Sequence, residues 1–134
     1  MRYLLDSNIV INYLNGSIPA TGMEMINVIV DIDPLISVVT KMETLGFNFQ
    51  SADEQNLTET FINGSMVLGI DDKVVSKTID IRRTEIIKLP DAIIAATAIV
   101  NDLTLLTRNT KDFTKIGGLQ IIDRSDYEPF RLKK

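Results

Sequence analysis

The alternation of short apolar runs with helical patterns is the feature of this sequence that most constrains its fold. Five runs have the length and the apolar, often branched composition of buried strands: residues 2–5, 35–39, 66–70, 103–106 and 119–122. Segments with apolar residues at helical spacing separate them. Strands that alternate with helices form a parallel sheet covered on both faces by right-handed crossovers. We therefore predict an α/β fold, one three-layer domain over residues 1–134 with a central parallel sheet flanked by helices.

The longest helical pattern runs from Asp71 to Lys88. The apolar residues that we expect on its buried side are Val74, Val75, Ile79, Ile86 and Ile87. The stretch Leu89-Pro90-Asp91 then interrupts the pattern, because proline cannot donate the hydrogen bond of a helix interior. We expect a separate, fully buried helix from Ala92 to Val100.

The absence of two residue types narrows the chemistry open to this chain. It has no cysteine and no histidine among 134 residues, which excludes disulfides, thiolate metal sites, histidine-ligated zinc and a Ser-His-Asp triad. A metal site must therefore use oxygen ligands, which favours Mg²⁺ or Mn²⁺. The formal net charge of −4 argues against indiscriminate binding of nucleic acid, but it leaves room for a basic rim around an acidic cleft.

The hydropathy pattern does not point to a membrane. No apolar run reaches the roughly 18 residues that a membrane-spanning helix needs. A strand begins within the first few residues, so we expect no signal peptide. Together with the lack of cysteine, these features lead us to expect a cytoplasmic protein without membrane association.

Four of the 18 acidic residues stand where predicted strands end or predicted helices begin. Asp6 follows the first strand, and Glu43 is in the first turn of the helix after the second strand. Asp91 opens a nearly all-apolar helix, and Asp112 lies just beyond the fourth strand. In an open parallel sheet, ligands bind outside the carboxyl ends of the strands. We expect these four carboxylates to meet at that edge.

Each of these acids also has an ordinary structural explanation. Asp6 could cap its own helix, and Asp91 could complement a helix dipole, which is worth about 0.3–1 kcal/mol. Glu43 and Asp112 could be solvated surface charges. Their combination favours a different interpretation, because four carboxylates at one edge would repel one another and raise their own pKa values unless a cation lay between them. A hard divalent ion with oxygen ligands meets that requirement.

Four motifs in the sequence resemble those of a known family. They are Leu4-Leu5-Asp6-Ser7-Asn8, Glu43 after a β-branched strand, the stretch PDAIIAATA from Pro90 to Ala98, and the stretch LTRNTKDF from Leu106 to Phe113. In order and spacing they are similar to the motifs of PIN domains, and more narrowly to those of the small VapC-type toxins of type II toxin–antitoxin systems. The resemblance extends from the first predicted strand to the last. The helix opened by Asp91 and the loop that contains Asp112 are its most specific parts.

The resemblance implies a PIN-like fold and an Mg²⁺- or Mn²⁺-dependent endoribonuclease, which would leave a 5′-phosphate and a 3′-hydroxyl. The family's catalytic, metal-binding acids map onto Asp6, Glu43, Asp91 and Asp112. Asp6 and Asp91 would ligate the metal directly, and the other two would do so directly or through water. One or two divalent ions held in this way can activate water and neutralise the phosphate without histidine.

Three polar residues fall on positions that the resemblance marks as supports of the acids: Ser7, Thr107 and Asn109. The family often has aspartate where this chain has Asn109, and the amide removes one charge from a second metal site. Three basic residues, Arg108, Lys111 and Lys115, flank the proposed metal site. Our hypothesis is that they position the phosphates of an RNA substrate, the part of recognition that does not depend on base sequence.

The resemblance also implies protein partners. Members of the family usually form homodimers and are held inactive by a small antitoxin, so we expect a homodimer and a cognate antitoxin besides RNA. The predicted helices 23–30 and 55–62 have enough apolar residues to offer a partner a groove. Ordinary core packing explains the same residues equally well.

Alternatives to a ribonuclease toxin stay open from the sequence. One is a housekeeping PIN nuclease in RNA processing, and another is a catalytically weak module that binds a metal or a protein partner. A phosphoryl-accepting receiver-type domain is disfavoured. Such a domain needs an acidic pair near the N-terminus and an aspartate after a central strand, whereas Asp6 stands alone and Ile36-Ser37-Val38-Val39 contains no acid.

Overall fold

A computed structural model of the chain describes residues 2–18, 20–32 and 34–122. Within these ranges five strands form one sheet: β1 (Tyr3–Leu5), β2 (Leu35–Ser37), β3 (Met66–Leu68), β4 (Thr104–Leu106) and β5 (Ile121–Ile122). Their order is β3-β2-β1-β4-β5, and every pairing is parallel. The predicted α/β class and parallel sheet are confirmed. Residues 123–134, which we included in the predicted single domain, lie outside the described residues.

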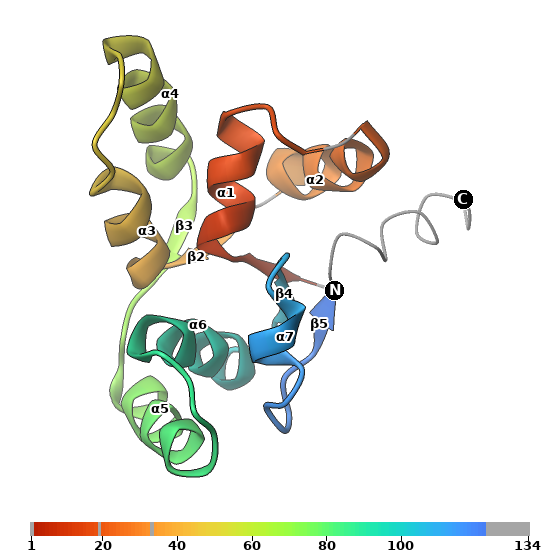
Figure 1. Ribbon diagram of the computed structural model, residues 1–134, viewed down its shortest axis with the longest axis vertical. Coiled ribbons are helices and arrows are strands. Elements are labelled where there is room, and N and C mark those ends of the chain that lie inside the picture. Colours follow the sequence, from red (N-terminus) through yellow and green to blue (C-terminus); the bar gives the residue numbers. More distant parts are fainter. Residues whose placement is uncertain (1, 19, 33, 123–134) are drawn as a thin grey trace.

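Helices cover both faces of this sheet. They are α1 (Ser7–Leu14), α2 (Ala20–Ile32), α3 (Val38–Leu45), α4 (Ala52–Asn63), α5 (Asp72–Thr84), α6 (Leu89–Val100) and α7 (Thr110–Phe113). Figure 1 shows α1, α2 and α4 on one side of the sheet and α5 and α6 on the other. The result is the three-layer arrangement expected from the sequence. Within the described ranges, no helix combines the length and the apolar composition needed to cross a lipid bilayer.

Successive residues of each strand belong to two separate cores. Leu4 and Leu105 are register partners in β1 and β4, and they pack with α5 and α6. The next pair, Leu5 and Leu106, packs with α1, α2 and α4. All four side chains are at most 1% exposed. Because both faces of the sheet are buried, the strands are continuous apolar runs in the sequence and do not alternate with polar residues.

The segment after β3 differs from the prediction. Helix α5 ends at Thr84, and α6 already begins at Leu89 with Pro90 in its first turn, where the missing N–H would have had no helical partner. Ala92 to Ala98 are largely buried, as expected for α6. Three other expectations were wrong, since Val75, Ile79 and Ile86 are exposed. Helix α5 is the outermost helix on its side of the sheet and buries only the face toward α6, and Ile86 lies in the loop that follows it (Figure 1).

The difference in burial between Leu105 and Ile86 gives a direct test of the fold. We expect Leu105→Ala to lower the free energy of unfolding by about 2–5 kcal/mol, because the change leaves a cavity in a fully buried strand. Ile86→Ala removes a side chain that is 95% exposed, so its effect should stay within about 0.5 kcal/mol. Urea unfolding followed by circular dichroism measures both. An equal loss for the two variants would contradict the assignment of Ile86 to the surface.

Candidate active site

The carboxyl ends of the central strands deliver polar residues to one edge of the sheet. Asp6 directly follows β1, and its backbone N–H donates to Leu106 O at 3.0 Å, which extends the β1–β4 ladder by one residue. Thr107 directly follows β4, and its N–H donates to Ile122 O at 3.1 Å. Strand β2 leads into α3 without an intervening residue. The backbone at this edge is therefore fixed by the sheet itself.

Asp6 is buried at this edge, with a side chain only 3% exposed. It is the N-cap of α1, and its Oδ1 accepts the backbone N–H of Ser7 at 2.8 Å. Its Oδ2 accepts the hydroxyl proton of Thr107 at 2.7 Å. The capping role considered from the sequence is therefore real, but it uses one carboxylate oxygen only. The bond from Thr107 ties the acid to a second strand and fixes its orientation.

Ser7 connects Asp6 to a second acid. Its hydroxyl donates to Glu43 Oε1 at 2.6 Å and also lies 3.0 Å from the hydroxyl of Thr40. Glu43 is on α3 and its side chain is exposed. Through its N–H and its hydroxyl, Ser7 thus contacts the acid that follows β1 and an acid of α3. This matches its expected place beside the acids.

The fourth acid, Asp112, lies in the short helix α7 and is contacted by the loop that precedes this helix. The Asn109 N–H donates to Thr107 Oγ1 at 2.9 Å, and the Asn109 side-chain amide donates to Asp112 Oδ2 at 3.0 Å. Thr107 is fully buried, and Asp112 is partly buried. A continuous hydrogen-bonded path therefore joins Asp112, Asn109, Thr107 and Asp6. Both residues expected to support the acids in this loop contact an acid directly.

Asp91 differs from the other three acids in the hydrogen bonding of its carboxylate. It lies in the first turn of α6 and is partly buried, and no hydrogen bond from the described residues reaches its carboxylate. Its pKa is raised above the usual value by burial first, and then by the negative charges of Glu43 and Asp112. The positive charge of Lys88 acts in the opposite direction. Asp91 is therefore a carboxylate whose ionised form is disfavoured by burial and by two other acids.

The same repulsion reaches Asp6. Its pKa is raised to about 6, mainly by burial, although the hydrogen bonds from Thr107 and Ser7 oppose the shift. The charges of Asp91 and Glu43 raise it further. Asp91 thus interacts electrostatically with each of the other three acids, and Asp6 also interacts with Glu43. That the four acids meet around one metal ion stays a prediction. Their roles as ligands and catalysts stay predictions.

The acids converge without forming a closed cage. Among the residues that the structure describes, no three acidic side chains are arranged as a ready-made set of metal ligands. The donors are all oxygens, which suits a hard divalent cation. Mg²⁺ in particular keeps several of its waters and is commonly held by only one or two carboxylates. The open arrangement is compatible with that kind of binding and not with a fully protein-built site.

Two residues near the acids were not singled out from the sequence as members of the site. Lys88 is the N-cap residue of α6 and acts electrostatically on Asp91. Thr40 contacts Ser7 and is completely buried. A threonine three residues before Glu43, on the same face of a helix, was the available signal for Thr40.

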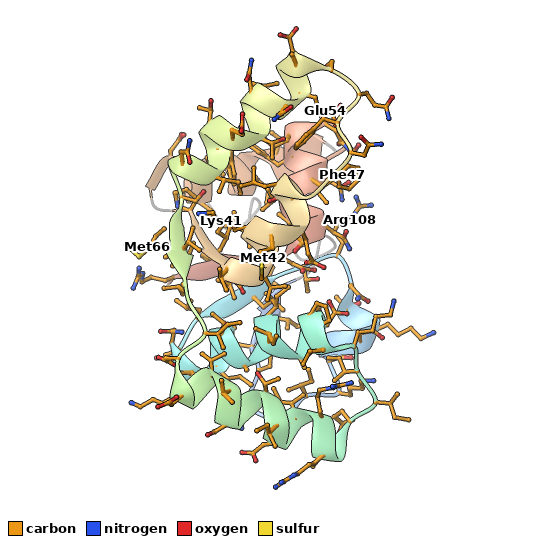
Figure 2. The ribbon with its side chains drawn as sticks, turned by 90° about the vertical axis from the view of Figure 1, so that its left-hand side faces the viewer. Lys41, Met42, Phe47, Glu54, Met66 and Arg108 are labelled. Carbon is orange, nitrogen blue, oxygen red and sulfur yellow. The ribbon has the colours of Figure 1, made fainter. Side chains whose placement is uncertain are left out.

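The three basic residues expected to bind phosphates differ in their surroundings. Arg108 and Lys111 are exposed, and Figure 2 shows Arg108 at the middle level of the molecule, where the loop after β4 reaches the surface. Lys115 is also exposed, but its ammonium group donates to the carbonyl of Ile86 at 2.5 Å. One of the three N–H groups of the Lys115 ammonium therefore bonds to the loop before α6, and two N–H groups remain for a phosphate.

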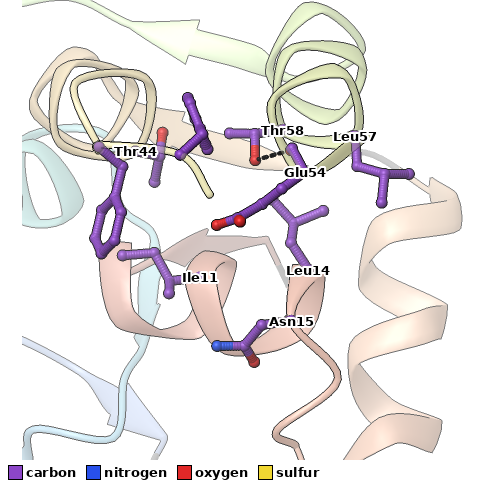
Figure 3. Close-up of a pocket in the computed structure, with 9 residues that line it drawn as sticks. Ile11, Leu14, Asn15, Thr44, Glu54, Leu57 and Thr58 are labelled. Carbon is purple, nitrogen blue, oxygen red and sulfur yellow. Dashed lines mark hydrogen bonds between the residues drawn. The ribbon is translucent and has the colours of Figure 1, made fainter. Parts of the chain in front are cut away.

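A separate apolar pocket lies between α1, α3 and α4. It has a volume of about 130 Å³ and contains none of the four acids; its lining is Ile11, Leu14, Asn15, Thr44, Phe47, Phe49, Glu54, Leu57 and Thr58. Figure 3 shows Leu57 on α4 and Ile11 and Leu14 on α1 around this space. Phe47 and Leu57 are more than half exposed. Of the two helices expected to offer a groove, α4 contributes to this pocket, whereas none of the described side chains of α2 lines it.

Comparison with known proteins identifies the family. The PIN domain family matches residues 3–119, so this chain belongs to the PIN domain family. PIN domains are nucleases, which hydrolyse phosphodiester bonds and generally use divalent metal ions. A search among curated proteins gave no match.

Solved structures of toxin–antitoxin complexes contain chains of the same fold. A chain of DNA-bound VapBC from Salmonella typhimurium is 26% identical, with a TM-score of 0.79 over 92% of this chain and 98% of that one. A toxin–antitoxin complex from Klebsiella pneumoniae gives 28% identity and a TM-score of 0.74, over 91% and 97%. VapBC-1 from nontypeable Haemophilus influenzae gives 26% and 0.77, over 93% and 99%. The resemblance to VapC-type PIN domains is confirmed.

The raised pKa of Asp6 predicts how stability depends on pH. The folded protein binds this proton more tightly than the unfolded chain, whose pKa is 3.8, so ionisation of Asp6 lowers stability as the pH rises from about 4 through about 6. A shift of this size corresponds to about 3 kcal/mol. In EDTA, we expect Asp6→Asn to gain about that amount relative to the parent between about pH 4 and about pH 7. Urea unfolding measures it; a difference that does not change with pH would contradict the raised pKa.

Proposed function

We propose that this protein is a metal-dependent endoribonuclease that hydrolyses RNA phosphodiester bonds and acts as the toxin of a type II toxin–antitoxin pair. The observation that supports it best is the meeting of Asp6, Glu43, Asp91 and Asp112 at the carboxyl edge of a PIN-domain sheet. The mutual repulsion of these acids costs stability, and a cation bound between them would relieve it. A bound divalent ion would supply positive charge, and the same ion would bind the negatively charged phosphate of the substrate.

Mg²⁺ or Mn²⁺ is the proposed cofactor, because the residues offer only oxygen donors. Asp91 is the first candidate ligand, since no hydrogen bond from the described residues engages its carboxylate. Asp6 is the second, and it retains lone pairs after accepting from Ser7 and Thr107. Glu43 and Asp112 would act through water. A bound divalent ion supplies an acidified water and neutralises the charge that develops on the phosphate.

The chain's own contribution is to hold these groups in place before substrate arrives. The Thr107 hydroxyl and the Ser7 N–H each donate a hydrogen bond to one oxygen of Asp6. The Asp6 carboxylate therefore does not need to turn when a cation binds. Asn109 similarly fixes Asp112. The pre-set orientation of Asp6 lowers the reorganisation that the reaction would otherwise require.

A protein partner is proposed from the solved relatives, which are VapBC toxin–antitoxin complexes. We expect a cognate antitoxin to bind this chain, and the chain to form a homodimer. The pocket between α1, α3 and α4 is a candidate antitoxin surface, because Phe47 and Leu57 expose apolar area beside it. It is separate from the acids, so a partner seated there need not contact them to bind.

The first test concerns the metal and Asp91. Purified protein should cleave structured RNA with Mg²⁺ or Mn²⁺ and not with EDTA. Asp91→Asn should slow cleavage at least about a hundredfold, equivalent to about 2.7 kcal/mol of barrier, because it removes the least constrained candidate ligand. Rates are measured under single-turnover conditions on a 5′-labelled RNA.

Asp102→Asn is the matched control for that test. Asp102 follows the opposite end of the same helix, is exposed, and has a positive φ of 55° that asparagine also tolerates. This variant should cleave at the parental rate. Full activity of Asp91→Asn, or activity in EDTA, would refute the assignment of the site. Inactivity of the parent with every divalent ion would instead favour a catalytically weak binding module.

The second test concerns the phosphates. In the Asp91→Asn background, the double change Arg108→Ala with Lys111→Ala should lower the slope of log affinity against log salt by about 1.4, since each lost phosphate contact accounts for roughly 0.7. The control pair is Lys73→Ala with Arg83→Ala, two exposed residues of α5. Fluorescence anisotropy with a labelled single-stranded RNA measures the slopes. Equal slopes for the two pairs would remove Arg108 and Lys111 from the RNA-binding surface.

A further inference from the structure

Thr40 has a buried hydroxyl whose environment is unusual in this protein. The residue lies in the first turn of α3 and is completely buried. Within the described part of the chain, its hydroxyl makes one hydrogen bond, to Ser7 Oγ at 3.0 Å. Glu43 follows Thr40 by three residues, so both side chains project from the same face of α3.

The other buried threonines in the described parts of the helices satisfy their hydroxyls in another way. Each donates to the backbone carbonyl four residues earlier, which is the common solution inside a helix: they are Thr44, Thr58, Thr78 and Thr97. Thr40 comes too early in α3 for this bond, because the residue four positions before it, Ile36, belongs to β2. Its hydroxyl is directed at a side chain of the active site instead.

The direction of the Thr40–Ser7 bond follows from a count of protons. A serine hydroxyl has a single proton, and an ionised carboxylate can only accept. Ser7 therefore donates its proton to Glu43, in a short bond of 2.6 Å. The oxygen of Ser7 is then the acceptor for Thr40. The hydrogen bonds run in one direction, from Thr40 to Ser7 to Glu43.

We propose that Thr40 is a positioning residue of the active site, which fixes the Ser7 hydroxyl and through it the Glu43 carboxylate. The meaning of this role for metal binding rests on the function proposed above. Ser7 also donates its N–H to Asp6 Oδ1 at 2.8 Å, so the same serine sets Asp6 and Glu43 relative to each other. Without the proton from Thr40, the Ser7 hydroxyl can rotate, and the exposed Glu43 side chain is free to turn toward solvent.

Three variants of the full chain test the role. Thr40→Val removes the hydroxyl at nearly constant shape, and Thr40→Ser keeps it. Thr44→Val is the matched control, since Thr44 is buried on the same helix and, among the described residues, its hydroxyl bonds only to backbone carbonyls. The first readout is the Glu43 side-chain rotamer in metal-free protein, from three-bond NMR couplings. The second is the dissociation constant of Mn²⁺ alone, from isothermal titration calorimetry without RNA.

Thr40→Val should give rotamer-averaged couplings at Glu43 and weaken Mn²⁺ binding by about tenfold, the lower end of the effect of residues that orient metal ligands. Thr40→Ser should restore both values, and Thr44→Val should leave both at the parental level. Ser7→Ala should match Thr40→Val. Combining the two changes should add nothing further, because they break one chain of bonds.

Parental couplings and parental Mn²⁺ affinity in Thr40→Val would overturn the inference. Equal changes in Thr44→Val would do so too, because they would mark a general loss of packing in α3. Should Thr40→Val not fold, Thr40→Ala and Thr44→Ala replace the valine pair with the same criteria. If the parent neither binds Mn²⁺ nor cleaves RNA, the proposed function fails, while the Glu43 couplings of the metal-free protein still decide the role of Thr40.

Discussion

The rest of this active site depends on the burial of one carboxylate, Asp6, at the point where β1, α1 and the loop after β4 meet. Burial is the largest cause of the raised pKa of Asp6, and the charges of Asp91 and Glu43 add to it. Hydrogen bonds from Thr107 and Ser7 oppose the shift only in part, so that the pKa is about 6. Neither bond comes from a cationic side chain. The described part of the chain thus keeps a carboxylate where it is poorly solvated, and it offers this carboxylate hydrogen bonds from uncharged donors.

Two neighbouring acids also accept hydrogen bonds from uncharged donors. Glu43 is bound by a serine hydroxyl, and Asp112 by the amide of Asn109. Neutral donors orient a carboxylate without cancelling its charge, whereas a lysine or arginine in contact would compete with a metal ion for it. The negative potential of the site is therefore preserved for a cation. The two hydrophobic cores on either face of the sheet provide the stability that offsets the repulsion among the acids.

The sequence was sufficient to predict the order of the strands along the chain, because the five runs are predominantly apolar, as is typical of strands buried on both faces. The second run was predicted too long, since Val38 and Val39 belong to α3. The sequence also predicted the acids, since the carboxyl end of a parallel strand is a known place for them. Burial within α5 could not be predicted in the same way. Val75 and Ile79 are as apolar as Val74, and only the packing of α5 against α6 decides which of them is covered. Thr40 was missed because its partner, Ser7, is 33 residues away.

Asn109 illustrates how an amide in place of a carboxylate changes the electrostatics of the loop after β4. An aspartate at this position would place a second negative charge about as far from Asp112 as the amide nitrogen is now, 3.0 Å. The amide instead donates a hydrogen bond there, and its backbone N–H supports Thr107, which in turn holds Asp6. Compared with an aspartate, the amide of Asn109 removes one negative charge from the site and fixes the loop by hydrogen bonds. The structure therefore relies on three acids around Asp91 and on hydrogen-bonded order in the β4–α7 loop, where a fifth carboxylate would have required more cationic charge to hold the same geometry.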